Sequence, residues 1–207
     1  MAIRDQILKK RLLVIALAVI FIVPFHAAVS YAAEDPQTLL ENLWKQIQQV
    51  VSEKNSYSST DMIEEALARH YDFDTFYEKA LADHWPSWTD MQKSEFDARF
   101  RKIFLTTLAR KIGKVPTNDV SLAFEHQAEA KDRAVLHAVG EKGEKEVRFK
   151  TFFINRKGVW KIYDVEIEGA LLSRNYRGQF NRILRRENYS GLLAKLDKKL
   201  QKQGEKS

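Results

Sequence analysis

The stretch Gly158 to Phe180 reads GVWKIYDVEIEGALLSRNYRGQF, and the spacing of its apolar residues changes in the middle. In the first half, side chains alternate with a period of two, with Tyr163 and Val165 on one face and Asp164 on the other, as is typical of a β-strand. After Gly169 the apolar residues recur every three or four positions, as on one face of an α-helix. The stretch therefore predicts a strand that runs directly into a helix.

The rest of the chain predicts helices before the strands. Four helices are predicted before residue 114, the first opened by Asp35 and Pro36 and the longest by a capping box of Thr89 and Gln92. The period then changes to two in four segments, Val120 to Ala128, Ala130 to Gly140, Glu146 to Ile154, and Val159 to Glu168. Two helices follow, Leu171 to Arg186 and Ser190 to Lys202, the second capped by Ser190. Because short glycine-bearing turns join the strands, we expect an α+β fold with a twisted, antiparallel four-stranded sheet and helices on one face.

The N-terminal segment 1–33 is typical of a secretory signal peptide. Basic residues precede the apolar run Leu12 to Val23, which is shorter than the about 20 residues that span a bilayer, and small residues follow near Ala32. An uncleaved membrane anchor is the alternative. The sequence thus predicts a single domain over residues 34–203 and a loose C-terminal tail over residues 204–207.

Charge and composition exclude several classes of function. The formal net charge is +6, and loss of the four basic residues and one acidic residue of segment 1–33 leaves a mild +3, so nucleic acid is a poor partner. The chain has no cysteine, which excludes disulfides and thiolate chemistry.

No residue pattern indicates catalysis or metal binding. The histidines show no HExxH spacing, and His126 and His137, which a hairpin would bring together, are interpreted as surface imidazoles. Asp164, Glu166 and Glu168 share a strand face, which we interpret as the solvated side rather than as paired acid and base groups. No glycine-rich phosphate loop or GxSxG motif occurs. The sequence predicts a protein that is not an enzyme, without cofactor or metal.

Two segments together resemble the MlaC family of periplasmic phospholipid-binding proteins, which includes proteins first named for toluene tolerance. The C-terminal matches are Trp160, Tyr163, Asp164, Glu168, Gly169, Asn175, Tyr176, Arg177, Gln179 and Phe180. The helical matches, within Leu67 to Ile112, are His70, Tyr71, Phe73, Ala80, Leu81, Trp85, Thr89, Gln92, Phe96 and Phe100. In one departure, Ala170 and Leu171 stand where the family usually has valine and serine.

The resemblance implies a lipid carrier. Large apolar residues on the long helix and the sheet are by themselves typical of a core, but the family parts its helices and sheet to hold acyl chains. The residues expected to line such a cavity are Leu67, Phe73, Phe96, Phe100, Phe104, Phe124, Phe149, Phe153, Tyr163, Val165 and Phe180. The family's role implies a periplasmic, monomeric auxiliary protein that shuttles phospholipid between an outer-membrane lipoprotein complex and an inner-membrane ABC transporter, and so maintains outer-membrane lipid asymmetry.

The C-terminal segment Leu171 to Ser207 is strongly basic, with ten basic and three acidic residues. Arg174, Arg177 and Arg182 are predicted to dock acidic partner surfaces or, for Arg177 above all, to pair with a lipid phosphate. A solvated helix face is the alternative interpretation.

Three other functions remain open at this level. The chain could carry a hopanoid or another polycyclic lipid, which the shape of the cavity would decide. It could be a small enzyme of the NTF2-like kind, with Asp164 as the carboxylate. It could also be a structural envelope protein held by an uncleaved anchor.

Overall fold

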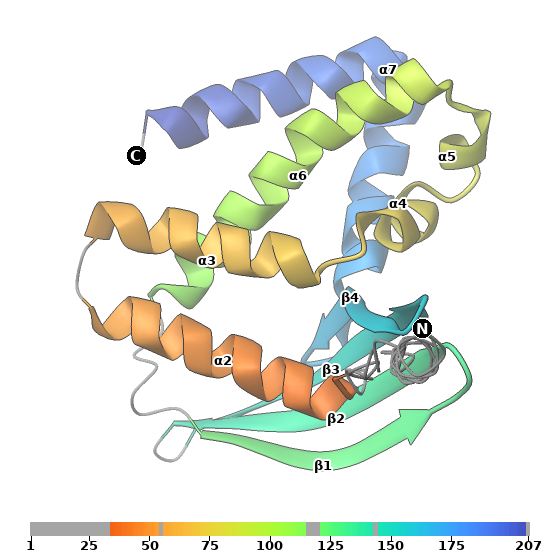
Figure 1. The fold of residues 1–207 in the computed structure, drawn as a ribbon. Helices are drawn as coiled ribbons and strands as arrows, with labels where there is room; N and C mark the ends of the chain where they lie inside the picture. Colours follow the sequence, from red (N-terminus) through yellow and green to blue (C-terminus); the bar gives the residue numbers. More distant parts are fainter. Residues whose placement is uncertain (1–33, 54–55, 115–120, 143–144, 206–207) are drawn as a thin grey trace, which may run out of the picture. The chain divides into compact units, whose positions relative to one another are not determined.

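The computed structural model describes residues 34–53, 56–114, 121–142 and 145–205, and confirms the α+β prediction (Figure 1). The predicted signal segment 1–33 lies outside the described residues. In chain order the elements are α2 (Pro36–Ser52), α3 (Ser56–His70), α4 (Phe73–Leu81), α5 (His84–Ser87), α6 (Asp90–Ile112), β1 (Ser121–Glu129), β2 (Arg133–Lys142), β3 (Lys145–Arg156), β4 (Val159–Ile167), β5 (Ala170–Leu171) and α7 (Leu172–Gly204).

The starts of α2 and α6 follow the predicted capping signals. The Asp35 carboxylate accepts hydrogen bonds from the backbone N–H groups of Gln37 and Thr38, at 2.9 and 3.1 Å, and Pro36 begins α2. At the start of α6, the Thr89 hydroxyl accepts from the Gln92 backbone, and the Gln92 side chain accepts from the Thr89 backbone. Each bond satisfies an N–H group that the first turn of a helix leaves without a partner.

The sheet is an antiparallel meander in the order β1-β2-β3-β4-β5, so it has five strands where the sequence predicted four. The extra strand arises at Glu168 and Gly169, which have positive φ angles of 48° and 76°. Two consecutive positive φ angles make a tight hairpin turn, which folds the short β5 back onto β4 with Ala170 opposite Ile167. β4 therefore does not run directly into α7, although the sequence predicted that it would.

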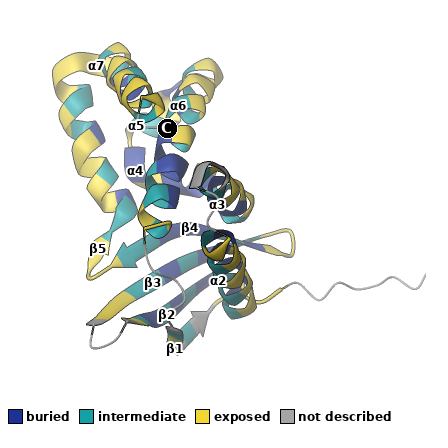
Figure 2. Cartoon of the chain, turned by 90° about the vertical axis from the view of Figure 1, so that its left-hand side faces the viewer, coloured by how far each residue is buried: buried dark blue, intermediate teal, exposed yellow. Residues whose placement is uncertain are grey.

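The helices of the described residues lie on one face of the sheet, as predicted (Figure 2). Helices α2, α3, α4 and α7 contact the strands, while α6 packs on α3 and α7. The tightest packing is an aromatic cluster between α4, α6 and α7. Its members are Tyr71, Phe73, Phe76, Tyr77, Trp85, Trp88, Phe96, Phe100, Phe104, Tyr176, Phe180 and Tyr189, with neighbouring ring centroids 4.9–6.2 Å apart.

The C-terminal region forms two helical halves, as predicted, but the break between them lies at Asn188. The φ angle of Asn188 is 56°, which no α-helix allows. Its side-chain oxygen accepts a 3.3 Å hydrogen bond from the backbone N–H of Gly191, so Asn188 caps the second half. The prediction of Ser190 as the cap was wrong because the backbone leaves helical geometry at Asn188 and is helical again directly after it.

Candidate functional site

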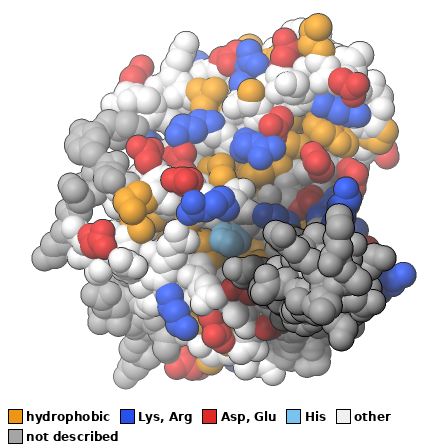
Figure 3. All heavy atoms as spheres, in the orientation of Figure 1, with side chains coloured by type: hydrophobic (Ala, Val, Ile, Leu, Met, Phe, Trp, Pro, Cys, Tyr) orange, Lys and Arg blue, Asp and Glu red, His pale blue; other side chains and the backbone are white. Residues whose placement is uncertain are grey.

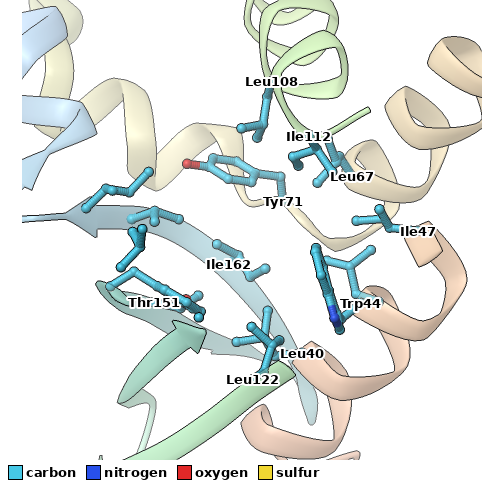
Figure 4. Close-up of a pocket in the computed structure, with 16 residues that line it drawn as sticks. Leu40, Trp44, Ile47, Leu67, Tyr71, Leu108, Ile112, Leu122, Thr151 and Ile162 are labelled. Carbon is cyan, nitrogen blue, oxygen red and sulfur yellow. The ribbon is translucent and has the colours of Figure 1, made fainter. Parts of the chain in front are cut away.

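A cavity of about 450 Å³ lies between the sheet and the helices α2, α3 and α6 (Figure 4). Ligand sites in proteins are typically about 300–1,000 Å³. The lining residues are Leu40, Leu43, Trp44, Ile47, Leu67, Tyr71, Leu108, Ile112, Leu122, Gly140, Val147, Phe149, Thr151, Ile162, Val165 and Ile167. Of the residues that the structure describes, no Lys, Arg, Asp or Glu lines this cavity, so its interior suits an apolar ligand.

Helix α2 forms one wall because its apolar residues cover a wide arc. Leu39, Leu43 and Ile47 are fully buried, whereas Leu40 and Trp44 are only partly buried. Leu40 and Trp44 line the cavity together with Leu43 and Ile47, so two neighbouring rows of this helix reach it (Figure 4). A helix that only packed on a sheet would need one narrow apolar stripe. The second apolar row, Leu40 and Trp44, is therefore a sequence signal for the cavity, and the predicted lining did not include it.

Strand β2 leaves space in the cavity wall at Gly140, the one residue of this strand that lines the cavity. Ala138 pairs with Phe149 of β3, and Gly140 pairs with both Leu122 of β1 and Val147 of β3. A methyl group added at Gly140 would lie 3.7 Å from the Phe149 ring and 3.9 Å from Leu122, which are ordinary contact distances. No close approach therefore requires glycine here, and its effect is to leave space between larger neighbours.

A β-bulge in β4 sets which side chains reach the cavity. Phe152 pairs with Asp164 and Phe153 with Ile162, so Tyr163 is the extra residue between them. An extra residue shifts the alternation of a strand by one position. For this reason Ile162, before the bulge, and Val165, after it, line the same cavity although they are three residues apart.

Three of the eleven residues predicted from the sequence line the cavity, namely Leu67, Phe149 and Val165. Tyr163 does not, because the bulge separates it from Val165, and it packs on Phe152 at 6.0 Å. The other seven belong to the hydrophobic core or pack against it: Phe73, Phe96, Phe100, Phe104, Phe124, Phe153 and Phe180. Helical spacing shows that a stripe is buried but not whether it meets another side chain or a cavity.

The cavity opens toward solvent at one end of the sheet. Val147 of β3 and Ile167 of β4 line it and are nevertheless 44% and 40% exposed. These exposed apolar side chains indicate that the cavity reaches the molecular surface at this end.

A comparison with protein families finds that the family model described as MlaC protein matches residues 37–198. The chain belongs to the MlaC family. Among solved structures, the phospholipid-binding protein from Ralstonia solanacearum in complex with a phospholipid matches with a TM-score of 0.72 and 18% sequence identity, covering 82% of this chain and 99% of that chain. A comparison with curated protein sequences finds no match. The structural likeness shows that the two proteins share a fold.

Asp164 of β4 is held by hydrogen bonds from the first turn of α7. The Ser173 hydroxyl and backbone N–H both donate to the Asp164 carboxylate, which also accepts from the backbone N–H of Val165. Asp164 is 1% exposed, and burial raises its pKa although these hydrogen bonds oppose the shift. The prediction that Asp164 lies on the solvated side was therefore wrong, because the start of α7 covers this end of β4.

The three arginines proposed for docking lie in the first half of α7, outside the cavity lining. The Arg177 guanidinium donates a 2.8 Å hydrogen bond to the Lys79 backbone carbonyl, which ties α7 to α4. Arg174 and Arg182 are exposed, and Arg182 borders a surface hollow with Gly178, Asn181, Arg185 and Arg186. Six other arginines of this MlaC chain pair with a carboxylate: Arg69, Arg99, Arg101, Arg133, Arg148 and Arg156.

Arg174, Arg182, Arg185 and Arg186 form no ion pair within the described part of the chain. We call these four residues the α7 arginine face. On the side of the molecule that Figure 3 shows, basic and acidic side chains are interspersed. The α7 arginine face is a group of positive charges that the described residues leave without a carboxylate partner.

Within the described residues, no group of three or more His, Asp or Glu side chains could hold a metal ion. His126 pairs with His137 in the register of β1 and β2, as the hairpin argument predicted. No helix within the described ranges is long and apolar enough to span a bilayer.

Proposed function

We propose that this MlaC family member is a periplasmic carrier that holds the acyl chains of a phospholipid in the cavity and leaves the head group outside. The observation that carries the proposal is the uncharged, apolar lining of a cavity that opens at Val147 and Ile167. The phospholipid bound to the Ralstonia protein of the same fold supports it.

The energetics explain why a lipid needs such a carrier. Each methylene group exposed to water costs about 0.8 kcal/mol, so a lipid with roughly 30 methylenes faces on the order of 20 kcal/mol on leaving a bilayer. An apolar cavity offsets this term, whereas a buried phosphate would lose its hydration without a counter-charge in the lining. Chains inside and head group outside is the arrangement that satisfies both requirements, and it needs no catalytic group.

Native mass spectrometry of the protein purified from the periplasm tests the proposal. We expect a mass lacking residues 1–33, a monomer, and one bound phospholipid, which solvent extraction then identifies. A protein free of lipid that also fails to transfer phospholipid between vesicles would contradict the proposal. Extraction of a polycyclic lipid would instead favour the hopanoid alternative, and a mass that includes residues 1–33 would favour the anchored envelope protein.

We also propose that the α7 arginine face docks acidic surfaces of two membrane complexes, an inner-membrane ABC transporter complex and an outer-membrane lipoprotein complex, between which lipid is shuttled. The supporting observation is that these arginines lack carboxylate partners among the described residues, while six others have them. Complementary charge raises the association rate more than it raises the affinity. This suits a carrier that must also dissociate from its partner.

Charge reversal tests this docking role. The double change Arg174→Glu with Arg182→Glu should leave the bound phospholipid in place but slow its exchange with the isolated transporter complex by at least about tenfold at low salt. The matched control is Lys198→Glu with Lys202→Glu, which makes the same charge change on exposed positions in the second half of α7. Equal exchange rates in both double variants would exclude the α7 arginine face as the docking surface.

A further inference from the structure

The first half of α7 carries a surface hollow of about 430 Å³. The residues that line it are Gly178, Asn181, Arg182, Arg185 and Arg186, and we call it the α7 hollow. Their spacing of three, four, seven and eight positions from Gly178 places them on one face of the helix. Asn181 is partly buried and the other four are exposed, so the α7 hollow is open to a partner in solution.

Gly178 leaves a gap among the longer side chains of the α7 hollow, and the fold does not require glycine there. Position 178 has helical backbone geometry, and a methyl group added to it would have no atom within 4 Å. Glycine is less favourable in a helix interior than every residue except proline. What glycine provides at such a position is a backbone that another molecule can approach closely.

The cations around Gly178 are all guanidinium groups. The first half of α7, residues 172–188, has five arginines and no lysine, whereas the second half, residues 189–204, has four lysines and no arginine. Arginine presents a planar fork of N–H donors that matches a carboxylate or a phosphate, and lysine does not. A helix that needed only solubility would have no reason to use one type in each half. The arginines therefore indicate recognition of an anionic partner.

The carboxylates of this chain do not neutralise the α7 hollow. Within the described residues, its three arginines form no ion pair, whereas Lys195 of the second half pairs with Glu187 at 3.0 Å. Asp197 of the second half pairs with Arg99 of α6 at 2.7 Å. The three guanidinium groups of the hollow therefore stay available to an acidic partner.

The length of the α7 hollow favours an acidic helix over a membrane surface. Gly178 and Arg186 are about 12 Å apart along the helix axis, and Arg182 and Arg186 about 6 Å. Carboxylates four residues apart on a second helix have the same spacing. The distance between two packed helices depends on the side chains at their contact, so a second helix can come closest at Gly178. A bilayer surface is broad and flat, and it gains nothing from the gap at this position.

We propose that an acidic helix of a partner complex crosses α7 at Gly178 and pairs its carboxylates with Arg182, Arg185 and Arg186. This inference rests on the proposed docking role of the α7 arginine face. It adds that docking requires the shape of the α7 hollow as well as its charge. A side chain that fills the gap at position 178 should therefore prevent docking even though every arginine is kept.

The test fills the α7 hollow without changing its charge. Gly178→Leu is compared with the matched control Gln179→Leu, which adds the same side chain at an exposed position outside the hollow. Both proteins are loaded with phospholipid, and its exchange with the isolated transporter complex is measured at low salt. Gly178→Leu should exchange lipid at least about tenfold more slowly than the wild type, because the helices are held apart, and Gln179→Leu should exchange at the wild-type rate. In urea, Gly178→Leu should be at least as stable as the wild type, since leucine favours the helix.

Each other outcome contradicts a defined part of the proposal. Wild-type exchange by Gly178→Leu would overturn the acidic helix and leave the docking role of the α7 arginine face intact, as would equally slow exchange by both leucine variants. Wild-type exchange by the Arg174→Glu and Arg182→Glu double variant would remove the docking role, and this inference with it. Sedimentation with phosphatidylglycerol vesicles tests the membrane surface: binding that Gly178→Leu abolishes would assign the hollow to lipid and overturn the acidic helix.

Discussion

At the scale of single residues, Gly140 is the position where side-chain volume most directly sets the size of the cavity. Gly140 lines the cavity between Phe149 and Leu122, where an added methyl group would be at ordinary contact distance and a larger side chain would occupy cavity space. A larger residue at position 140 should therefore change ligand binding without preventing folding.

We expect Gly140→Ile to weaken phospholipid binding while the protein stays folded. Isoleucine adds three carbon atoms beyond the methyl group that fits, so it should remove roughly 2.4 kcal/mol of binding free energy, or about 50-fold in affinity, by lipid titration. Thermal unfolding of the delipidated variant should be unchanged or slightly higher, because a filled cavity is stabilising. Gly140→Ala is the control and should bind almost as the wild type does. Equal affinities in all three proteins would mean that lipid does not occupy this cavity.

The buried Asp164 carboxyl predicts a pH dependence of stability. Burial raises its folded-state pKa above the ordinary value of 3.8, so the folded state binds this proton more tightly than the unfolded state does. Its contribution to stability is therefore full below pH 3.8 and is lost as the pH rises through the folded-state pKa. Relative to Asp164→Asn, which cannot ionise, the wild-type protein should gain unfolding free energy as the pH falls from 7 toward 4.

Urea unfolding of both proteins at several pH values measures this difference. A difference that does not change with pH would show that Asp164 has the same pKa in both states. The same variant addresses the enzyme alternative, since Asp164 is bound to Ser173 and lies outside the cavity lining. We expect Asp164→Asn to retain its lipid and its transfer activity.

At the scale of elements, α7 combines two glycines whose structural roles are opposite. Gly191 follows the break at Asn188, and a methyl group added there would lie 2.4 Å from the Glu187 Cβ atom, closer than atoms can approach. Gly178 lies in the regular first half of the helix, where an added methyl group would have no atom within 4 Å. Only the first glycine is required by the backbone.

We expect alanine to affect these two glycines in opposite directions. Gly178→Ala should raise the unfolding free energy by up to about 1 kcal/mol through helix propensity, as measured in urea. Gly191→Ala should lower it by roughly 1–3 kcal/mol, because the clash with Glu187 exceeds the same gain in propensity. If both variants were stabilised, the bend at Asn188 would not be a fixed feature of α7.

At the scale of the whole molecule, the apolar residues have two roles: some pack the core and others enclose the cavity. The aromatic cluster between α4, α6 and α7 is closely packed and holds the helices together, while the α2 and β1–β4 side leaves open space. A domain that leaves space beside its core gives up contacts that a bound ligand can restore.

Removal of lipid should therefore lower the stability of the protein. A ligand present at 100 times its dissociation constant stabilises the folded state by about 2.7 kcal/mol, which for a chain of this size corresponds to roughly 5–10 °C in Tm. Calorimetry of the lipid-loaded and delipidated protein measures the shift. Gly140→Ile should show a smaller shift, whereas identical Tm values with and without lipid would contradict a cavity-bound ligand.

Much of the fold could be predicted because its signals are local. The Asp35 cap, the capping box at Thr89 and Gln92, and the period-two segments act within a few residues, and each corresponds to an observed helix start or strand. The single added residue in β4 could not be predicted, because it shows only in the pairing with β3. That bulge explains why Val165 lines the cavity and Tyr163 does not.

The sequence by itself determined the α+β class, the helices on one face of the sheet, and the resemblance to the MlaC family, since periodicity and capping are properties of neighbouring residues. Only the tertiary structure decided which apolar residues enclose space and which fill it. Phe96 and Phe100 look like cavity residues by spacing, yet their rings stack at 5.3 Å, while Leu40 and Trp44 line the cavity. The physical reason is that a cavity is defined by where side chains from distant segments fail to meet, and no local pattern contains that information.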